Sequence, residues 1–148
     1  MIKAVHARYI LDASVAAKWF TGHAEADREV ALTLREFHRT QRCRLVVPEF
    51  GSLEVLNAVR FSPRATEADT AEALAGLKDL DLPIEPLSWD LLRKATAIAW
   101  GYRVALYDAV YVALAEVMGF PFVTADEALV KQMKGHSIVL RLRDLEFY

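Results

Sequence analysis

Four acidic residues of this chain have no cation beside them in the sequence to balance their charge. Asp12 follows the apolar run YIL within LDAS, and Asp126 follows PFV within VTAD. Glu54 and Asp108 instead belong to apolar helical patterns, GSLEVLNAV and LYDAVYVALAE. Because like charges that share a pocket raise one another's pKa values, a group made of these four carboxylates needs a neutralising cation.

A divalent metal ion is the simplest cation for such a group. The ligands are all oxygen atoms, without histidine or cysteine, and this favours Mg²⁺ or Mn²⁺ over zinc. A phosphate ester is the natural substrate, because metal ions neutralise its oxygens and stabilise the leaving oxygen. The residues therefore predict metal-dependent chemistry on a phosphate ester, with one catalytic and metal-binding set: Asp12, Glu54, Asp108 and Asp126.

Each acid also has a structural explanation of its own. Asp108 could cap the free N–H groups at the start of its helix, where the helix dipole favours a negative charge. Asp12 and Asp126 could be ordinary turn or N-cap residues. Glu54 could form a salt bridge with an arginine. Of the four acids, Asp108 is the hardest to explain structurally. It shares a helix face with Tyr111, and burying a carboxylate without a partner costs several kcal/mol of folding free energy.

The fold that positions these acids can be predicted from the alternation of elements. Short apolar runs bounded by turn residues alternate with longer helical patterns, which is typical of β-α units around a parallel sheet. We expect strands at YIL, LVV, PIEPL, PFV and SIVLRL. The predicted fold class is α/β, a three-layer α/β/α domain with a mostly parallel central sheet of about five strands, over residues 1–148 as a single domain. Ligands bind beyond the carboxyl ends of such strands, which places Asp12 and Asp126 on one edge.

Capping residues predict where several helices begin and end. Thr66 with Asp69 resembles a capping box, and Ser88 is placed to cap WDLLRKATAIAW. Pro48 fits the first turn of a helix from about Glu49 to Phe61. The apolar pattern of that helix predicts that most of it is buried, with Glu54 and Asn57 as a polar pair inside it. We expect helices to end at three glycines: Gly101, Gly119 and Gly135.

Composition limits the classes of protein that remain. The chain has 148 residues, 54% of them hydrophobic, and a formal net charge of −2. It contains no apolar run of bilayer length and no secretion signal, so we expect a cytoplasmic protein without membrane contact. The single cysteine, Cys43, excludes an internal disulfide and a Cys-rich zinc site. Contact with nucleic acid must come from local basic clusters, because domains that bind it by bulk electrostatics are clearly basic.

Four segments, taken together, resemble the PIN-domain family. LDASVAAKWF, LVVPEFGSLEVLNAV, LYDAVYVALAE and VTADEAL occur in the order and spacing of that family, and are most similar to VapC-type toxins of toxin–antitoxin pairs. The resemblance runs from about Tyr9 to Leu142. It implies a metal-dependent endoribonuclease that cleaves RNA, forms a homodimer and is blocked by an antitoxin protein. It also implies the acidic set named above as the active site, with three supporting polar groups: Ser14, Asn57 and Thr124.

On this interpretation, hydrolysis of the RNA phosphodiester leaves a 5′-phosphate and a 3′-hydroxyl, and the sequence leaves open whether one ion or two take part.

Two other functions remain open. A catalytically silent PIN-fold binding module is disfavoured because all four acids are present. A phospho-acceptor signalling domain also uses acids and Mg²⁺ at strand ends, but no lysine follows a later strand where that class needs it. We further expect exposed apolar surface, including Trp19 or Phe20, to meet a second chain.

Overall fold

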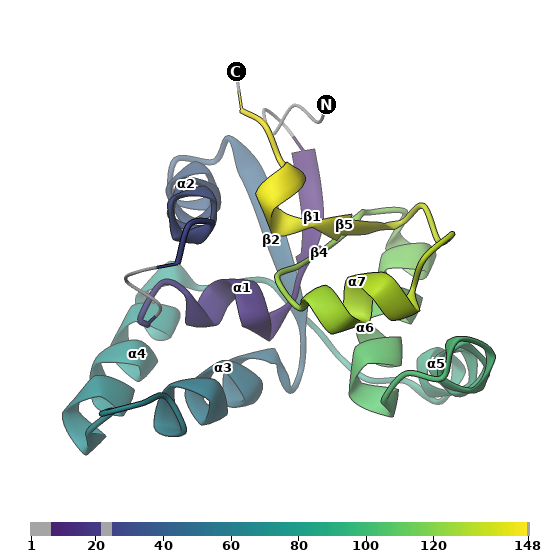
Figure 1. Cartoon of the computed structure of the whole chain (residues 1–148), viewed down its shortest axis with the longest axis horizontal. Helices are drawn as coiled ribbons and strands as arrows, with labels where there is room; N and C mark the ends of the chain where they lie inside the picture. The colour runs from purple at the N-terminus through teal and green to yellow at the C-terminus, as the bar shows by residue number, and fades with distance from the viewer. Residues whose placement is uncertain (1–6, 22–24, 148) are drawn as a thin grey trace.

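A sheet of five parallel strands forms the centre of the molecule (Figure 1). The computed structural model describes residues 7–21 and 25–147. The strands occur in the order β3-β2-β1-β4-β5, and every pairing between them is parallel. Their bounds are β1 Ala7–Leu11, β2 Cys43–Pro48, β3 Ile84–Glu85, β4 Phe122–Thr124 and β5 Val139–Arg141. The five predicted strands and their parallel arrangement are confirmed.

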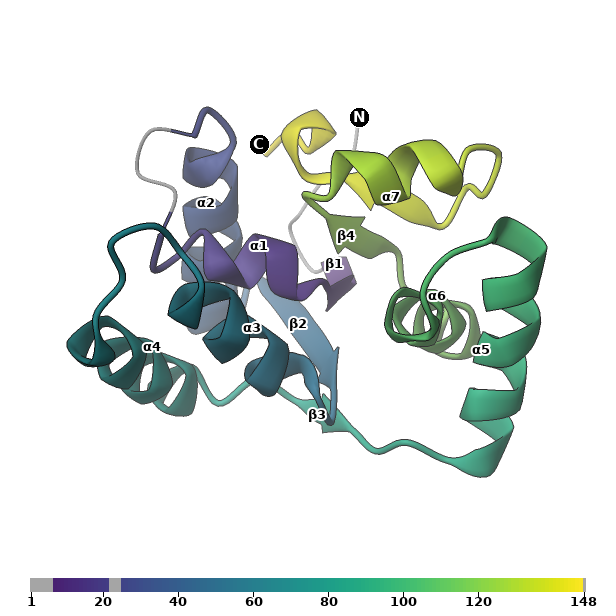
Figure 2. The same cartoon turned by 60° about the horizontal axis from the view of Figure 1, so that its bottom comes forward.

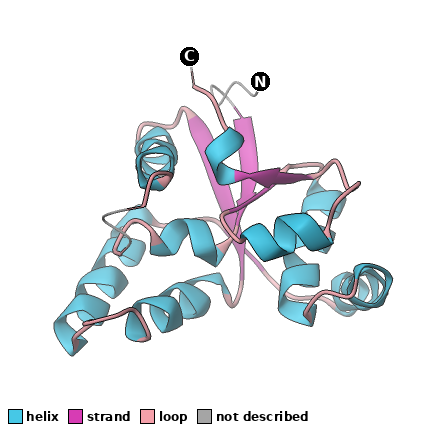
Figure 3. Cartoon of the chain, viewed as in Figure 1, coloured by secondary structure: helices cyan, strands magenta, loops and turns pink. Residues whose placement is uncertain are grey.

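Helices cover both faces of the sheet, as Figures 1, 2 and 3 show from two directions. On one face lie α1 Ala13–Ala17, α2 Arg28–Arg39, α3 Gly51–Arg60 and α4 Glu67–Leu80. On the other lie α5 Trp89–Tyr102, α6 Leu106–Met118 and α7 Glu127–Gln132. A short 3₁₀ helix, η1 Leu142–Asp144, follows β5. The predicted three-layer α/β/α fold is therefore correct.

The two halves of the core follow from the alternation of side chains along β1. Tyr9 and Leu11 pack into the cluster formed with α1 and α2, whereas Ile10 packs into the cluster formed with α5 and α6. All three residues are fully buried. Because successive residues of a strand point to opposite faces, a strand covered on both sides must be apolar throughout. This is why the segment leading to Asp12 is a continuous apolar run.

Several helix boundaries lie where the caps predict them. At the start of α4, Thr66 Oγ1 accepts a hydrogen bond from Asp69 N, while the Asp69 carboxylate accepts one from Thr66 N. Ser88 Oγ accepts a hydrogen bond from Leu91 N at the start of α5. Gly119 ends α6 with a φ of 71°, which is the left-handed conformation that glycine adopts most readily.

Other local predictions were wrong. Pro48 is the last residue of β2 and not the first turn of a helix, because it pairs with β3 as extended chain, and α3 begins only at Gly51. Gly101 lies inside α5, whose left-handed cap is Arg103 with a φ of 57°. Gly135 has a φ of 95° but lies in the turn beyond α7 and not directly at its end.

Helix α3 is more exposed than its apolar sequence predicts. Val55 and Val59 are buried, but Leu53 is 68% exposed and Asn57 is also exposed. The helix packs on α1 and α4 along one side only. The prediction of a mostly buried helix with an internal polar pair is therefore wrong, although Glu54 itself is partly buried.

Trp19, one of the two residues expected at an exposed partner surface, belongs to the core instead. Its side chain is 4% exposed and its indole Nε1 donates a hydrogen bond of 2.8 Å to the carbonyl oxygen of Ala31. Phe20 is partly buried against the same core. No helix in the described ranges is long and apolar enough to cross a membrane.

Candidate active site

The carboxyl edge of the sheet receives the four predicted acids. Asp12 follows β1 directly, and its backbone N–H donates a hydrogen bond of 3.0 Å to Val123 O of β4. Asp126 follows β4 after one intervening residue. Glu54 and Asp108 lie in the first turns of α3 and α6. The topology therefore brings together carboxylates from four separate segments of the chain.

Asp12 is the most deeply buried of these acids, with 6% of the residue exposed. Its Oδ2 accepts hydrogen bonds from Ser14 Oγ at 2.7 Å and from Thr124 Oγ1 at 2.6 Å. Burial raises the pKa of Asp12, the two hydroxyl groups lower it, and the nearby charge of Asp126 raises it further. Two neutral donors therefore hold the Asp12 carboxyl group in place, and no salt bridge reaches it among the described residues.

The two hydroxyl groups are themselves fixed by the backbone after β4. Thr124 Oγ1 accepts a hydrogen bond of 3.0 Å from Asp126 N, and Ser14 Oγ accepts one of 3.0 Å from Ala125 N. Each hydroxyl therefore accepts one hydrogen bond from the backbone and donates its own proton to Asp12. The structure places Ser14 and Thr124, predicted as supporting groups, in direct contact with the acid.

Glu54 is bonded to a residue of the opposite layer. Tyr111 Oη donates a hydrogen bond of 2.8 Å to Glu54 Oε1. Burial raises the pKa of Glu54, the bond from Tyr111 lowers it, and the charge of Asp12 raises it. The salt bridge considered as an alternative for Glu54 is absent from the described part of the chain.

Tyr111 is the site residue that the sequence analysis missed, because it was treated as an apolar neighbour of Asp108. The residue is fully buried and its ring packs edge-on against Phe50 at 5.5 Å and stacks on Phe122 at 5.3 Å between centroids. A signal was available, since a buried tyrosine hydroxyl nearly always needs a hydrogen-bond partner. A tyrosine within the apolar helix of Asp108 therefore pointed to a polar group nearby.

Asp108 does not cap its helix. The N-cap of α6 is Ala105, and no side-chain cap hydrogen bond is present there. Burial raises the pKa of Asp108 to about 6, with further contributions from the charges of Asp12, Asp126 and Glu54. The carboxylate therefore lies in the field of the other three acids, which is the arrangement that a bound cation would relieve.

Asp126 and Asn57 are placed differently from the inner acids. Asp126 is exposed, and its Oδ1 accepts a hydrogen bond of 3.1 Å from Leu129 N, so it caps α7 as the structural alternative proposed. Its charge nevertheless acts on Asp12 and Asp108. Asn57 lies exposed on α3, and none of the hydrogen bonds described for the site involves its side chain. Asn57 lies three residues after Glu54 on α3, and its supporting role stays a prediction.

The residues fit a divalent metal ion by their chemistry. Within residues 7–21 and 25–147, no three His, Cys, Asp or Glu side chains form a ready-made metal-binding group. The four acids nevertheless supply only hard oxygen donors, and three of them have pKa values raised by burial and by the charge of at least one other acid of the set. Mg²⁺ and Mn²⁺ are the ions that prefer such donors.

Comparisons with known proteins agree with this fold. The sequence model of the PIN domain family matches residues 9–134. A solved toxin–antitoxin complex from Klebsiella pneumoniae is 17% identical, covers 92% of this chain and 97% of its own, and has a TM-score of 0.65. A crystal structure from Pyrobaculum aerophilum is 23% identical over 95% of this chain and 93% of its own, with a TM-score of 0.64.

A third solved structure is the sarcin–ricin loop cleaving toxin VapC20 from Mycobacterium tuberculosis. It is 15% identical, covers 79% of this chain and 87% of its own, and has a TM-score of 0.58. A comparison with curated proteins finds no match. At these identities the structural likenesses establish the fold, and the family match covers the segments that carry all four acids.

Proposed function

Because this chain belongs to the PIN domain family, we propose that it is a metal-dependent endoribonuclease and the toxin of a type II toxin–antitoxin pair. One observation carries the proposal: Asp108 lies in the field of three other carboxylates, and no salt bridge from the described residues reaches any of the four. Solved structures of the same fold that are named as a toxin–antitoxin complex and as a sarcin–ricin loop cleaving toxin support the assignment.

Asp12, Glu54 and Asp108 are the residues that would hold the principal Mg²⁺ or Mn²⁺, and Asp126 would hold or orient a second. When bound, such an ion activates water and neutralises the charge of the phosphodiester. The chain contributes the positions of the ligands. Ser14 and Thr124 fix one oxygen of Asp12 before any ion arrives, so little reorganisation is needed on binding.

Tyr111 has the corresponding role for Glu54. Its hydroxyl holds Oε1 from the side of the core, which orients the carboxylate toward the other acids. None of the hydrogen bonds described for the site involves the Asp108 carboxylate, and with a pKa of about 6 it is mostly ionised at neutral pH but readily protonated below it. We infer that activity depends on the ionisation of Asp108 and falls in mildly acidic solution.

The proposal includes two protein partners, a second copy of the chain and an antitoxin. Exposed aromatic surface supports it: Trp89 is 85% exposed and Trp100 is 81% exposed on α5. The two tryptophans are separated by three helical turns and share one face of the helix. Large apolar side chains at such exposure are typical of surfaces that another chain covers.

Cleavage of RNA with and without a chelator tests the proposed activity. We expect the wild-type protein to cleave a structured RNA in Mg²⁺ or Mn²⁺, and Asp12→Asn to be inactive. Asp90→Asn is the matched control, because Asp90 also lies in the first turn of a helix but is bonded to Arg93 on the surface. Cleavage of equal rate in EDTA, or by Asp12→Asn, would contradict the proposal.

Growth measurements test the toxin assignment separately. We expect production of the wild-type chain without its antitoxin to arrest bacterial growth, and the Asp12→Asn variant at the same level to have no effect. Equal toxicity of the two proteins would mean that the acids are not responsible for it.

A catalytically silent binding module is the second candidate. The observation that favours it is that no three of the acids form a ready-made metal-binding group in the described residues. It predicts no metal-dependent cleavage of any RNA, and partner binding that is the same for the wild type and Asp12→Asn.

A further inference from the structure

Arg8 and Arg44 lie side by side at the amino edge of the sheet, opposite to the edge that carries the acids. They are the second residues of β1 and β2, and they are register partners in this parallel pair. Each precedes by two positions a residue of the core under α5 and α6, namely Ile10 and Val46. Because side chains alternate along a strand, both arginines point to that same face.

Like charges directly opposite one another on adjacent strands are destabilising. Neither arginine forms a salt bridge among the described residues. The guanidinium of Arg8 lies 5.5 Å from the centroid of the Phe120 ring, a contact that does not neutralise its charge. The pKa of His38 is lowered mainly by burial and additionally by the charge of Arg44. The pair is therefore a positive centre that no salt bridge from the described residues neutralises, although the carboxylate of Glu85 lines one of the cavities beside it.

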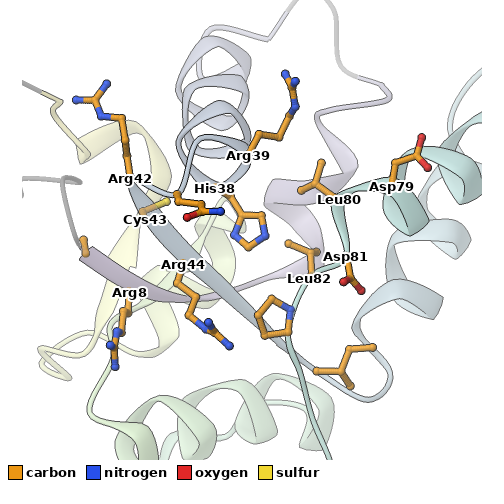
Figure 4. Close-up of a pocket in the computed structure, with 14 residues that line it drawn as sticks. Arg8, His38, Arg39, Arg42, Cys43, Arg44, Asp79, Leu80, Asp81 and Leu82 are labelled. Atoms are coloured by element: carbon orange, nitrogen blue, oxygen red, sulfur yellow. The ribbon is translucent and has the colours of Figure 1, made fainter.

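Two cavities meet at this pair. The larger, about 1120 Å³ as bounded by the described residues, is also lined by Arg42, His38 and Asp81. The smaller, about 250 Å³, is lined on its apolar side by Phe120 and also includes Glu85 in its lining. Arg8 and Arg44 line both cavities. Figure 4 shows their guanidinium groups extending in the same direction, with Asp81 on the far side of the larger cavity.

We propose that Arg8 and Arg44 form a binding site for a phosphate ester, separate from the acid site. Two guanidinium groups that face the same way match the several oxygens of a phosphate, each by a pair of parallel hydrogen bonds. A phosphate placed between them replaces their mutual repulsion with two attractions. The two oxygens of a carboxylate lie in one plane and match a single guanidinium, whereas the tetrahedral oxygens of a phosphate can meet two, and for this reason the site suits a phosphate better than an acidic side chain.

The phosphate ester has two sources that the chemistry of the site does not separate: the backbone of an RNA strand and the phosphate of a free nucleotide. The larger cavity has room for either, since small-molecule sites commonly enclose about 300–1,000 Å³. The site does not depend on the nuclease proposal, because β1 places Arg8 four residues before Asp12 and about 13 Å from it along the strand. Binding at the two sites can therefore be measured apart.

Thermal melting in EDTA tests the proposal without any turnover. The protein is melted in sodium chloride and in millimolar inorganic phosphate, adenosine monophosphate or a short single-stranded RNA, all at equal ionic strength. Wild type is compared with Arg8→Gln, Arg44→Gln and Arg44→Lys. Arg60→Gln is the matched control, because Arg60 is another exposed arginine over a phenylalanine ring, at 5.1 Å from the centroid of Phe61.

We expect a phosphate ligand at about ten times its Kd to raise the Tm of the wild type and of Arg60→Gln by about 4 °C. Arg8→Gln and Arg44→Gln should lose most of this shift, and Arg44→Lys should keep part of it because the charge remains. In chloride alone, Arg44→Gln should melt at the wild-type temperature or above, since it removes a repulsion. If only the RNA raises the Tm, the source of the phosphate is the RNA backbone. If the nucleotide raises the Tm, the source is a free nucleotide.

Three outcomes would overturn the proposal. One is an equal phosphate shift in the wild type and both glutamine variants, which would mean that phosphate binds elsewhere. Another is the absence of a shift with all three phosphate ligands. The third is protection by a polyglutamate peptide alone, which would identify the pair as a surface for an acidic protein segment.

Discussion

Tyr111 Oη donates a hydrogen bond of 2.8 Å to Glu54 Oε1, across 57 positions of sequence. The bond joins the first turn of α3 to the buried middle of α6, and therefore connects the two helical layers at the carboxyl edge of the sheet. Through this bond, the apolar helix α6 contributes a second polar group to the site, because Tyr111 positions Glu54 of α3.

Tyr111→Phe should weaken the acid site while keeping the fold. The phenyl ring preserves the packing on Phe50 and Phe122, and the loss of one hydrogen bond costs about 1 kcal/mol. Since the bond lowers the pKa of Glu54, its removal should raise that pKa and move the acidic limb of the pH–activity profile upward. A profile identical to the wild type, with unchanged Mn²⁺ affinity, would show that Tyr111 only packs.

Thr124→Val should destabilise the protein. The fully buried hydroxyl of Thr124 donates to Asp12 and accepts from the backbone of Asp126, so valine leaves both groups without this partner. Unsatisfied buried groups cost about 1–3 kcal/mol, which corresponds to a Tm lower by roughly 3–8 °C.

Thr124→Ser is the control for this change. It retains the hydroxyl and loses only a methyl group, so its Tm should lie between those of the valine variant and the wild type. If valine proves as stable as threonine in a melting experiment, the hydroxyl does not hold Asp12.

Asp108→Asn should stabilise the metal-free protein near neutral pH. The pKa of Asp108 is raised from 3.8 to about 6, so the ionised carboxylate opposes folding above pH 6. This cost decreases as the pH falls through 6 toward 4, because the native state then binds the proton more readily than the unfolded state. Allowing for screening, the variant should be more stable at pH 7.5 by on the order of 1 kcal/mol, or about 3 °C.

The measurement is a set of melting curves of both proteins in EDTA between pH 5 and pH 7.5. The difference between them isolates Asp108 from other titrating groups, including His38, whose pKa is lowered. A variant that melts below the wild type by the same amount at every pH would mean that Asp108 acts only through the helix dipole.

The positions of the acids at the strand ends could be predicted from the sequence more directly than the contacts between helices. Asp12 and Asp126 follow apolar strands, and in a parallel sheet the ends of β1 and β4 must lie together. Glu54 and Asp108 were predicted as apolar-helix acids with no cation nearby. Thr66 and Ser88 act in the caps as predicted, since capping depends on neighbours within three residues.

The errors concern contacts between distant segments. Pro48 extends β2 because β3 pairs with it, and Asn57 is exposed because α3 packs on α1 and α4 along one side only. The partner of Tyr111 lies on another helix, and the register of Arg8 with Arg44 exists only once β1 and β2 pair. The hydrophobic periodicity of a single segment cannot predict contacts of this kind, because each contact depends on a second segment.

Trp100→Glu should convert a homodimer to a monomer if the exposed face of α5 forms the interface between copies. Trp100 is 81% exposed, so the charge does not enter the core. Light scattering after size exclusion gives the mass of each protein, and Leu74→Glu on α4, at an exposed apolar position, is the control. A wild-type protein that is monomeric at all concentrations, or a variant that stays dimeric, would place the interface elsewhere.

Calorimetric titration with Mn²⁺ tests the central claim most directly, because it measures the ion at the four acids without depending on the right RNA. The wild type and Asp90→Asn should bind Mn²⁺ with the same Kd, while Asp12→Asn and Asp108→Asn should each bind it at least about tenfold more weakly, since each loses a charged ligand. An Mn²⁺ affinity shared by all four proteins, or no binding by the wild type, would contradict a metal site at Asp12, Glu54, Asp108 and Asp126.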